Sequence, residues 1–242
     1  MKNLLQKAFG LKNQFNFNPS KSKKLITRTL RQNIKFYKSS LNSSSQESNL
    51  SSLSQNLISK SQSFQKKNLL KNPLFFKDLS KSENSKILWI GCADSRVDPS
   101  DILSASPGQI SIARTVANQV NLNDQNILSV VEQAVLYQKV EHIIVCGHTN
   151  CGGVKASCAA SMDGLHPQLV GYLNPIRNLF KKVRGEFKGE EDDFLEVMYK
   201  ENVFEQVRNL MTVPVVKEAV DKGEVELIPL LFRMNHGVLE EI

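Results

Sequence analysis

Long hydrophobic runs are missing from this 242-residue chain, and acidic side chains are missing from its first 46 residues. No stretch approaches the roughly 20 consecutive apolar residues that a membrane-spanning helix needs, so we expect no membrane span. The first carboxylate is Glu47, and the ten charged side chains before it are all Lys or Arg. Residues 47–242 carry more acidic than basic groups, so the net charge of +7 comes from the N-terminal extension. A basic surface on the folded domain, as nucleic-acid binding requires, is therefore not expected.

Cysteine is scarce as well. The chain contains only Cys92, Cys146, Cys151 and Cys158, which are too few for the disulfide framework of a small secreted protein. No Cys-x-x-Cys pair is present, although structural zinc sites commonly use such pairs. We therefore expect these cysteines to bind a metal or to pack in the core.

The N-terminal extension, residues 1–46, is rich in Lys, Arg, Ser and Asn. This composition is typical of an organelle import signal, and the mitochondrial matrix is the expected compartment. The alternative is a basic tail without a targeting role, which would leave the protein in the cytoplasm. Residues 47–56 are rich in Ser, Asn and Gln and are expected to form a polar linker. Residues 57–242 are expected to form the functional domain.

Apolar runs at 87–90 and 142–146 predict two strands buried on both faces, and 110–116 and 224–232 are weaker strand candidates. Helical spacing over 126–139, 152–160 and 202–221 predicts helices between them, with a break at Pro214. Residues 57–79, interrupted at Pro73, predict an N-terminal helical arm in two pieces. The alternation of strands and helices predicts an α/β domain with a central, mostly parallel β-sheet flanked by helices.

A polar cluster follows each of the two best strands. The first strand leads into Cys92-Ala93-Asp94-Ser95-Arg96, and the second leads into His148-Thr149-Asn150-Cys151-Gly152-Gly153. Ligands of open parallel sheets bind beyond the carboxyl ends of the strands, so the two clusters are expected to meet there. Two thiolates and one imidazole form a known catalytic zinc set with a fourth position left for water. Cys92, His148 and Cys151 are therefore our candidate metal ligands.

Asp94 and Arg96 lie close to the first candidate ligand in sequence. A carboxylate two residues from a metal ligand is placed to accept a hydrogen bond from a zinc-bound hydroxide or to bind the metal itself. A guanidinium two residues further on is placed to hold that carboxylate through a forked, charge-assisted contact. The plainer interpretation is a surface salt bridge that contributes little.

These two clusters resemble the signature of the β-class carbonic anhydrases, and the similarity extends over residues 57–242. The resemblance implies a zinc enzyme that reversibly hydrates carbon dioxide to bicarbonate through zinc-bound hydroxide, with a homodimer as its minimal unit. It maps the metal ligands onto Cys92, His148 and Cys151, and the catalytic Asp/Arg pair onto Asp94 and Arg96. In that family the aspartate can also replace water on the metal and close the site. Because two thiolates neutralise the ion, we expect activity to rise toward alkaline pH.

The resemblance implies further assignments, and the sequence also departs from the family pattern. Gly152 and Gly153 map near the substrate, while Trp89 and Arg114 match residues of a regulatory bicarbonate site whose third partner, a tyrosine, has no counterpart here. The region after Leu227 is the least family-like. Two alternatives follow: a non-catalytic zinc-bound structural subunit of a larger mitochondrial assembly, or an enzyme that hydrolyses carbon disulfide or carbonyl sulfide.

Overall fold

The computed structural model describes residues 44–81 and 85–242. The chain divides into two units, one that extends to Phe75 and one that spans Phe76–Ile242. Helix α3 (Ser44–Lys71), in the first unit, ends shortly before Pro73, and the short helix α4 (Phe75–Leu79) begins at the boundary between the two units. The predicted two-piece helical arm is confirmed. Most of the import signal predicted at 1–46 lies outside the described residues.

Residues 47–56, which the sequence predicts to be a polar linker, are helical and form part of α3. From Ser44 to Lys71 the sequence contains no glycine or proline, so nothing in its backbone chemistry interrupts a helix. The side chains of α3 that the structure describes, from Ser52 onward, are almost all exposed, including Leu53, Leu57 and Phe64.

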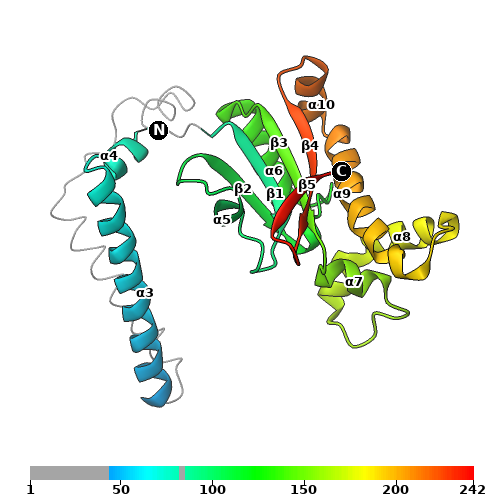
Figure 1. Ribbon diagram of the computed structural model, residues 1–242, viewed down its shortest axis with the longest axis horizontal. Helices are drawn as coiled ribbons and strands as arrows, with labels where there is room; N and C mark the ends of the chain where they lie inside the picture. The colour runs from blue at the N-terminus through cyan, green and yellow to red at the C-terminus, as the bar shows by residue number, and fades with distance from the viewer. Residues whose placement is uncertain (1–43, 82–84) are drawn as a thin grey trace, which may run out of the picture. The chain divides into compact units, whose positions relative to one another are not determined.

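The second unit is built on a five-stranded sheet with the strand order β2-β1-β3-β4-β5 (Figure 1). Its strands are β1 (Ile87–Cys92), β2 (Ile110–Thr115), β3 (His142–His148), β4 (Glu226–Arg233) and β5 (Val238–Glu241). Pairing is parallel throughout except between β4 and β5, which form an antiparallel hairpin at the C-terminus. The prediction of a mostly parallel sheet is confirmed, and β5 is a strand that the sequence patterns did not indicate.

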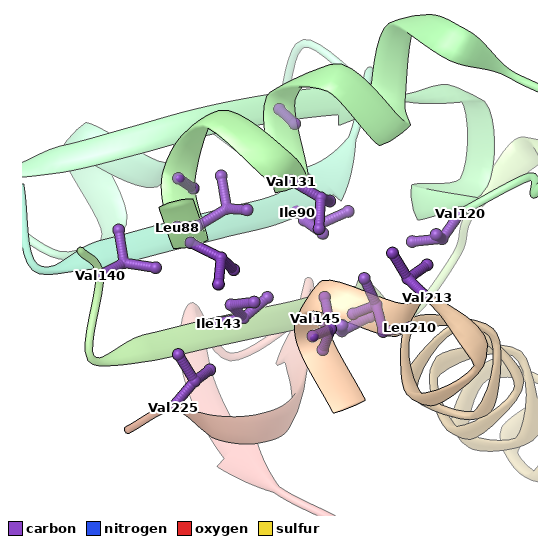
Figure 2. Packing of buried hydrophobic residues seen from close by; sticks show 14 of the residues in the cluster. Leu88, Ile90, Val120, Val131, Val140, Ile143, Val145, Leu210, Val213 and Val225 are labelled. Atoms are coloured by element: carbon purple, nitrogen blue, oxygen red, sulfur yellow. The ribbon is translucent and has the colours of Figure 1, made fainter. Parts of the chain in front are cut away.

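Side chains that alternate along β1 and β3 enter two separate apolar clusters. Leu88, Ile90, Ile143 and Val145 belong to a cluster that the helical residues of α6, α9 and α10 complete, for example Leu210 (Figure 2). The other cluster contains Trp89, Ile144 and Cys146 together with residues of α7, α8 and α9. Because both clusters are packed, each central strand is buried on both faces, as its uninterrupted apolar sequence requires.

The helices of this unit connect successive strands and cover the sheet. They are α5 (Pro99–Ile102), α6 (Gln125–Gln133) with a π-helical turn over Ala134–Gln138, α7 (Gly152–Cys158), α8 (Pro167–Glu186), α9 (Phe194–Thr212) and α10 (Pro214–Asp221), with 3₁₀ turns at Val116–Asn118 and Glu191–Asp193. The break predicted at Pro214 separates α9 from α10, because proline cannot donate the backbone hydrogen bond of a helix interior. Among the described residues, no helix is long and apolar enough to cross a membrane.

The strand order creates a switch point between β1 and β3. From β1 the chain crosses to β2 on one side, and it then returns to place β3 and β4 on the other side. Loops that leave the carboxyl ends of two such strands diverge and leave a crevice, which is where ligands of open α/β sheets bind. Cys92 ends β1 and His148 ends β3, so the fold brings both predicted clusters to this crevice.

Candidate metal centre

The three candidate ligands converge in the buried crevice. Cys92 is the last residue of β1, His148 is the last residue of β3, and Cys151 is the N-cap of α7. The Cys92 and Cys151 sulfur atoms are 3.9 Å apart. One ligand atom from each of the three residues lies within 4.8 Å of the others, and all three residues are buried. The predicted convergence of these side chains is therefore present in the structure.

The imidazole of His148 is oriented by its own loop. Its Nδ1 atom lies 2.9 Å from the carbonyl oxygen of Thr149, so Nδ1 carries the proton and donates to that oxygen. The other nitrogen, Nε2, is buried and has no hydrogen-bond partner. A buried nitrogen with a free lone pair is costly unless something binds it. A backbone acceptor on one ring nitrogen is the usual way in which proteins orient a metal-binding histidine.

The two thiols are electrostatically coupled. The contact with the Cys151 thiol lowers the pKa of Cys92, and the same contact, together with burial, raises the pKa of Cys151. Two thiolates this close together repel each other, and a cation bound between them would favour the charged form of both. Two sulfur atoms bound to one tetrahedral zinc ion lie about 3.8 Å apart, given Zn–S bonds of about 2.3 Å. The donor set of this chain thus fits zinc.

Asp94 and Arg96 form the forked contact that the sequence predicted. Arg96 donates from Nε to Asp94 Oδ1 at 2.9 Å and from Nη2 to Oδ2 at 2.6 Å, and its backbone N–H also donates to Oδ1. These hydrogen bonds hold the pKa of Asp94 well below its usual range. Asp94 Oδ2 lies 3.9 Å from His148 Nε2, so the carboxylate borders the point where the ligand atoms meet. Asp94 is largely covered, whereas about half of the Arg96 side chain is exposed.

Arg114 and Trp89, the predicted regulatory pair, have structural contacts. Arg114, in β2, donates from Nε to the Cys92 carbonyl at 2.8 Å and from Nη2 to the Asp94 carbonyl. These two hydrogen bonds hold in place the turn that carries Cys92 and Asp94. Trp89 is buried, and its indole lies directly over Gly91. Neither contact tests bicarbonate binding, which stays a prediction for both residues.

Because Gly153 has no side chain, the turn at Val116–Asn118 can pack closely against the ligand loop. A Cβ atom at Gly153 would lie 3.0 Å from the Cβ of Ala117, whereas one at Gly152 would meet nothing within 4 Å. Ala117 and Asn118 both have left-handed backbone angles, with φ of 55° and 49°, which is strained for residues other than glycine. The role predicted for Gly152 and Gly153 in substrate binding stays a prediction, and close packing accounts for Gly153.

Buried amide side chains of α9 hold this left-handed turn, and the sequence analysis gave them no role. Asn202 Nδ2 donates to the Ala117 carbonyl at 3.1 Å and to Asn118 Oδ1 at 3.3 Å. Gln206 Oε1 accepts the backbone N–H of Val120 at 2.8 Å. Asn202 and Gln206 are almost completely buried on a helix that is otherwise apolar on that side. Two amides four residues apart on one helix face are the signal that would have revealed them.

The comparisons with known proteins agree with this geometry. A family model described as carbonic anhydrase matches residues 87–239, which include both polar clusters. The chain belongs to the carbonic anhydrase family. A carbonic anhydrase of Emericella nidulans is 33% identical over 178 residues, which cover 71% of this chain and 75% of that relative.

Solved structures place this carbonic anhydrase in the β class. A tetrameric β-carbonic anhydrase of the filamentous ascomycete Sordaria macrospora aligns with a TM-score of 0.73 and 28% identity, covering 79% of this chain and 97% of that one. A β-carbonic anhydrase of Coccomyxa, solved in complex with acetazolamide, aligns with a TM-score of 0.72 and 28% identity over 77% of this chain and 85% of that one. The resemblance found in the sequence is thereby confirmed.

Proposed function

We propose that this carbonic anhydrase uses zinc to hydrate carbon dioxide reversibly to bicarbonate, with Cys92, His148 and Cys151 as the ligands. The observation that supports this most directly is the buried convergence of two sulfur atoms and an unpartnered imidazole nitrogen at the switch point of the sheet. When bound, zinc would acidify a water molecule and so supply the nucleophile that attacks carbon dioxide. The remaining steps fall to side chains of this chain.

Asp94 is the residue that would orient the attacking water. Its carboxylate stays charged because Arg96 lowers its pKa, so Oδ2 is available as a hydrogen-bond acceptor beside His148 Nε2. Arg96 occupies both carboxylate oxygens and thereby holds Asp94 in one orientation. This engagement is what we expect of the open state of the site, in which Asp94 does not act as a ligand itself. Asp94 and Arg96 are therefore the proposed catalytic pair.

The assembly and compartment are part of the same proposal. The Sordaria relative is described as tetrameric, which supports a homodimer or a higher oligomer for this chain. The basic, acid-free residues 1–46 support import into the mitochondrial matrix. Fluorescence microscopy of the full chain and of a variant without residues 1–46, each fused to a fluorescent protein, tests this. Equal distribution of the two fusions would contradict the targeting role.

The decisive experiment is stopped-flow carbon dioxide hydration by the purified zinc-loaded chain. Cys151→Ser should lose activity and zinc, whereas Cys158→Ser, a half-buried cysteine outside the ligand set, should keep both. Metal analysis of the same samples separates the alternatives. Zinc bound without turnover in the unaltered chain would favour the structural subunit, and turnover of carbonyl sulfide or carbon disulfide but not carbon dioxide would favour the other substrate class.

A further inference from the structure

Two residues, Thr149 and Asn150, connect the ligands His148 and Cys151. Asn150 has a left-handed backbone with φ of 59°, a conformation that glycine adopts freely and asparagine adopts at a modest cost. Its side-chain oxygen Oδ1 accepts a hydrogen bond from Lys155 Nζ at 2.7 Å. Lys155 lies on α7, the helix that Cys151 caps. The segment between the two ligands is thus hydrogen-bonded to α7, the helix that follows it.

The backbone carbonyl of Asn150 faces the catalytic pair. It accepts a hydrogen bond from Arg96 Nη2 at 3.3 Å, and the same Nη2 atom donates to Asp94 Oδ2 at 2.6 Å. Arg96 is half exposed, so few packing contacts hold its guanidinium in place. The Asn150 carbonyl is a second acceptor from the opposite cluster, and it fixes the direction from which Arg96 approaches Asp94.

The backbone N–H and the side-chain amide of Asn150 are also engaged. Its backbone is in hydrogen-bonding contact with Tyr199, and its Nδ2 atom lies 3.5 Å from Asn235 Oδ1. These residues line a surface cleft of about 370 Å³ together with Lys155. Because the contact between Lys155 and Asn150 lies at an exposed position, it is removable without opening a cavity in the core.

We propose that Asn150 and Lys155 are positioning residues for the Arg96–Asp94 pair, an inference that rests on the proposed function. Lys155 holds the Asn150 side chain, the side chain stabilises the left-handed backbone, and that backbone directs its carbonyl at Arg96. Loss of either side chain lets the Asn150 peptide rotate, so Arg96 loses an acceptor and Asp94 is less well oriented. The effect should fall on the chemical step rather than on substrate affinity.

The test uses Lys155→Met, Asn150→Gly and the double variant in the full zinc-loaded chain. Glycine retains the carbonyl and accepts positive φ, so this substitution removes only the side chain. Each single variant should lower kcat about fivefold with KM unchanged within about twofold, as expected for one hydrogen bond of ordinary net strength. Because both act through one contact, the double variant should also lose about fivefold. Lys217→Met, which removes an exposed ion pair with Asp221 on α10, is the control and should retain full activity.

A second measurement does not depend on turnover. Amide hydrogen exchange of the peptide spanning 148–153 should speed up in Lys155→Met and Asn150→Gly and stay unchanged in Lys217→Met. Unchanged exchange, unchanged kcat in the single variants, or a multiplicative loss of about 25-fold in the double variant would each overturn the proposal. An unaltered chain that does not hydrate carbon dioxide would instead refute the proposed function, and the exchange data would still decide the role of the contact.

Discussion

The two ends of β3 carry the same residue type in opposite environments. His142 opens the strand, where its side chain is partly exposed and its Nδ1 lies 3.2 Å from Glu226 of the neighbouring strand. His148 closes the strand, where it is buried, bonded to a backbone carbonyl and left with one unpartnered nitrogen. At the amino-terminal edge of this sheet the histidine lies beside the exposed carboxylate of Glu226, and at the carboxyl-terminal edge it is a candidate ligand.

This difference follows from the topology rather than from the residue. At the carboxyl edge the loops after β1 and β3 diverge, so backbone and side chains enclose a crevice. At the amino edge, pairs such as Lys86 with Glu141 are exposed on both sides, and water screens their attraction. A histidine is therefore informative about function only when its burial and its neighbours are known.

The largest expected effect comes from removing one histidine at a time. His148→Ala should abolish zinc retention and lower carbon dioxide hydration by at least about 10³-fold, because the nucleophile depends on the metal. His142→Ala should keep zinc and activity and change the free energy of unfolding by no more than about 1 kcal/mol. Metal analysis, stopped-flow kinetics and denaturant unfolding measure these outcomes. Loss of zinc in His142→Ala would remove the contrast between the two edges.

A smaller effect separates the metal ligands from Asp94. Asp94→Asn should retain zinc and lower kcat by about 10²-fold, the usual size of a lost acid–base or orienting group. Since Arg96 lowers the pKa of Asp94, this carboxylate is already charged at every pH above its ordinary value of about 4. The expected rise in activity toward alkaline pH is therefore not its titration. A pH–rate profile in which Asp94→Asn removes an inflection above about pH 5 would contradict this.

The smallest effect contrasts two glycines inside the ligand loop. Gly153→Ala should lower the free energy of unfolding by about 1–3 kcal/mol, because its new methyl group would press against Ala117 in a packed region. Gly152→Ala meets open space, so it should change stability by no more than about 0.5 kcal/mol. Denaturant unfolding of the zinc-loaded proteins tests both. Equal losses of unfolding free energy in the two variants would show that Ala117 moves to make room for the methyl group, so that the packing there is not tight.

The sequence predicted the parts of this molecule that depend on residue type and strand order. Apolar runs at 87–90 and 142–146 predicted the central strands, and the polar residues after them predicted the convergence of Cys92, His148 and Cys151. The forked contact between Arg96 and Asp94 followed from their spacing. These predictions succeeded because the carboxyl ends of neighbouring parallel strands lie at the same edge of the sheet.

Other features depend on tertiary context that a pattern does not contain. Strand β5 is short, and its pairing with β4 is decided by the turn that precedes it. The left-handed backbone of Ala117 and Asn150 accompanies hydrogen bonds with Asn202 and Lys155, which a local residue pattern does not reveal. The helix over 47–56 was missed because a Ser/Asn-rich composition disfavours helix only weakly. Import, compartment and assembly stay predictions.

The separation of the ligands along the chain has a consequence for folding. Cys92 and His148 meet only when β3 is paired with β1, because β2 and α6 separate these two strands along the chain. An unfolded chain offers no such grouping, so a metal ion binds the docked arrangement far more tightly than the open one. Zinc would then stabilise the pairing of β3 with β1. Its removal should destabilise these central strands before the outer strands of the sheet.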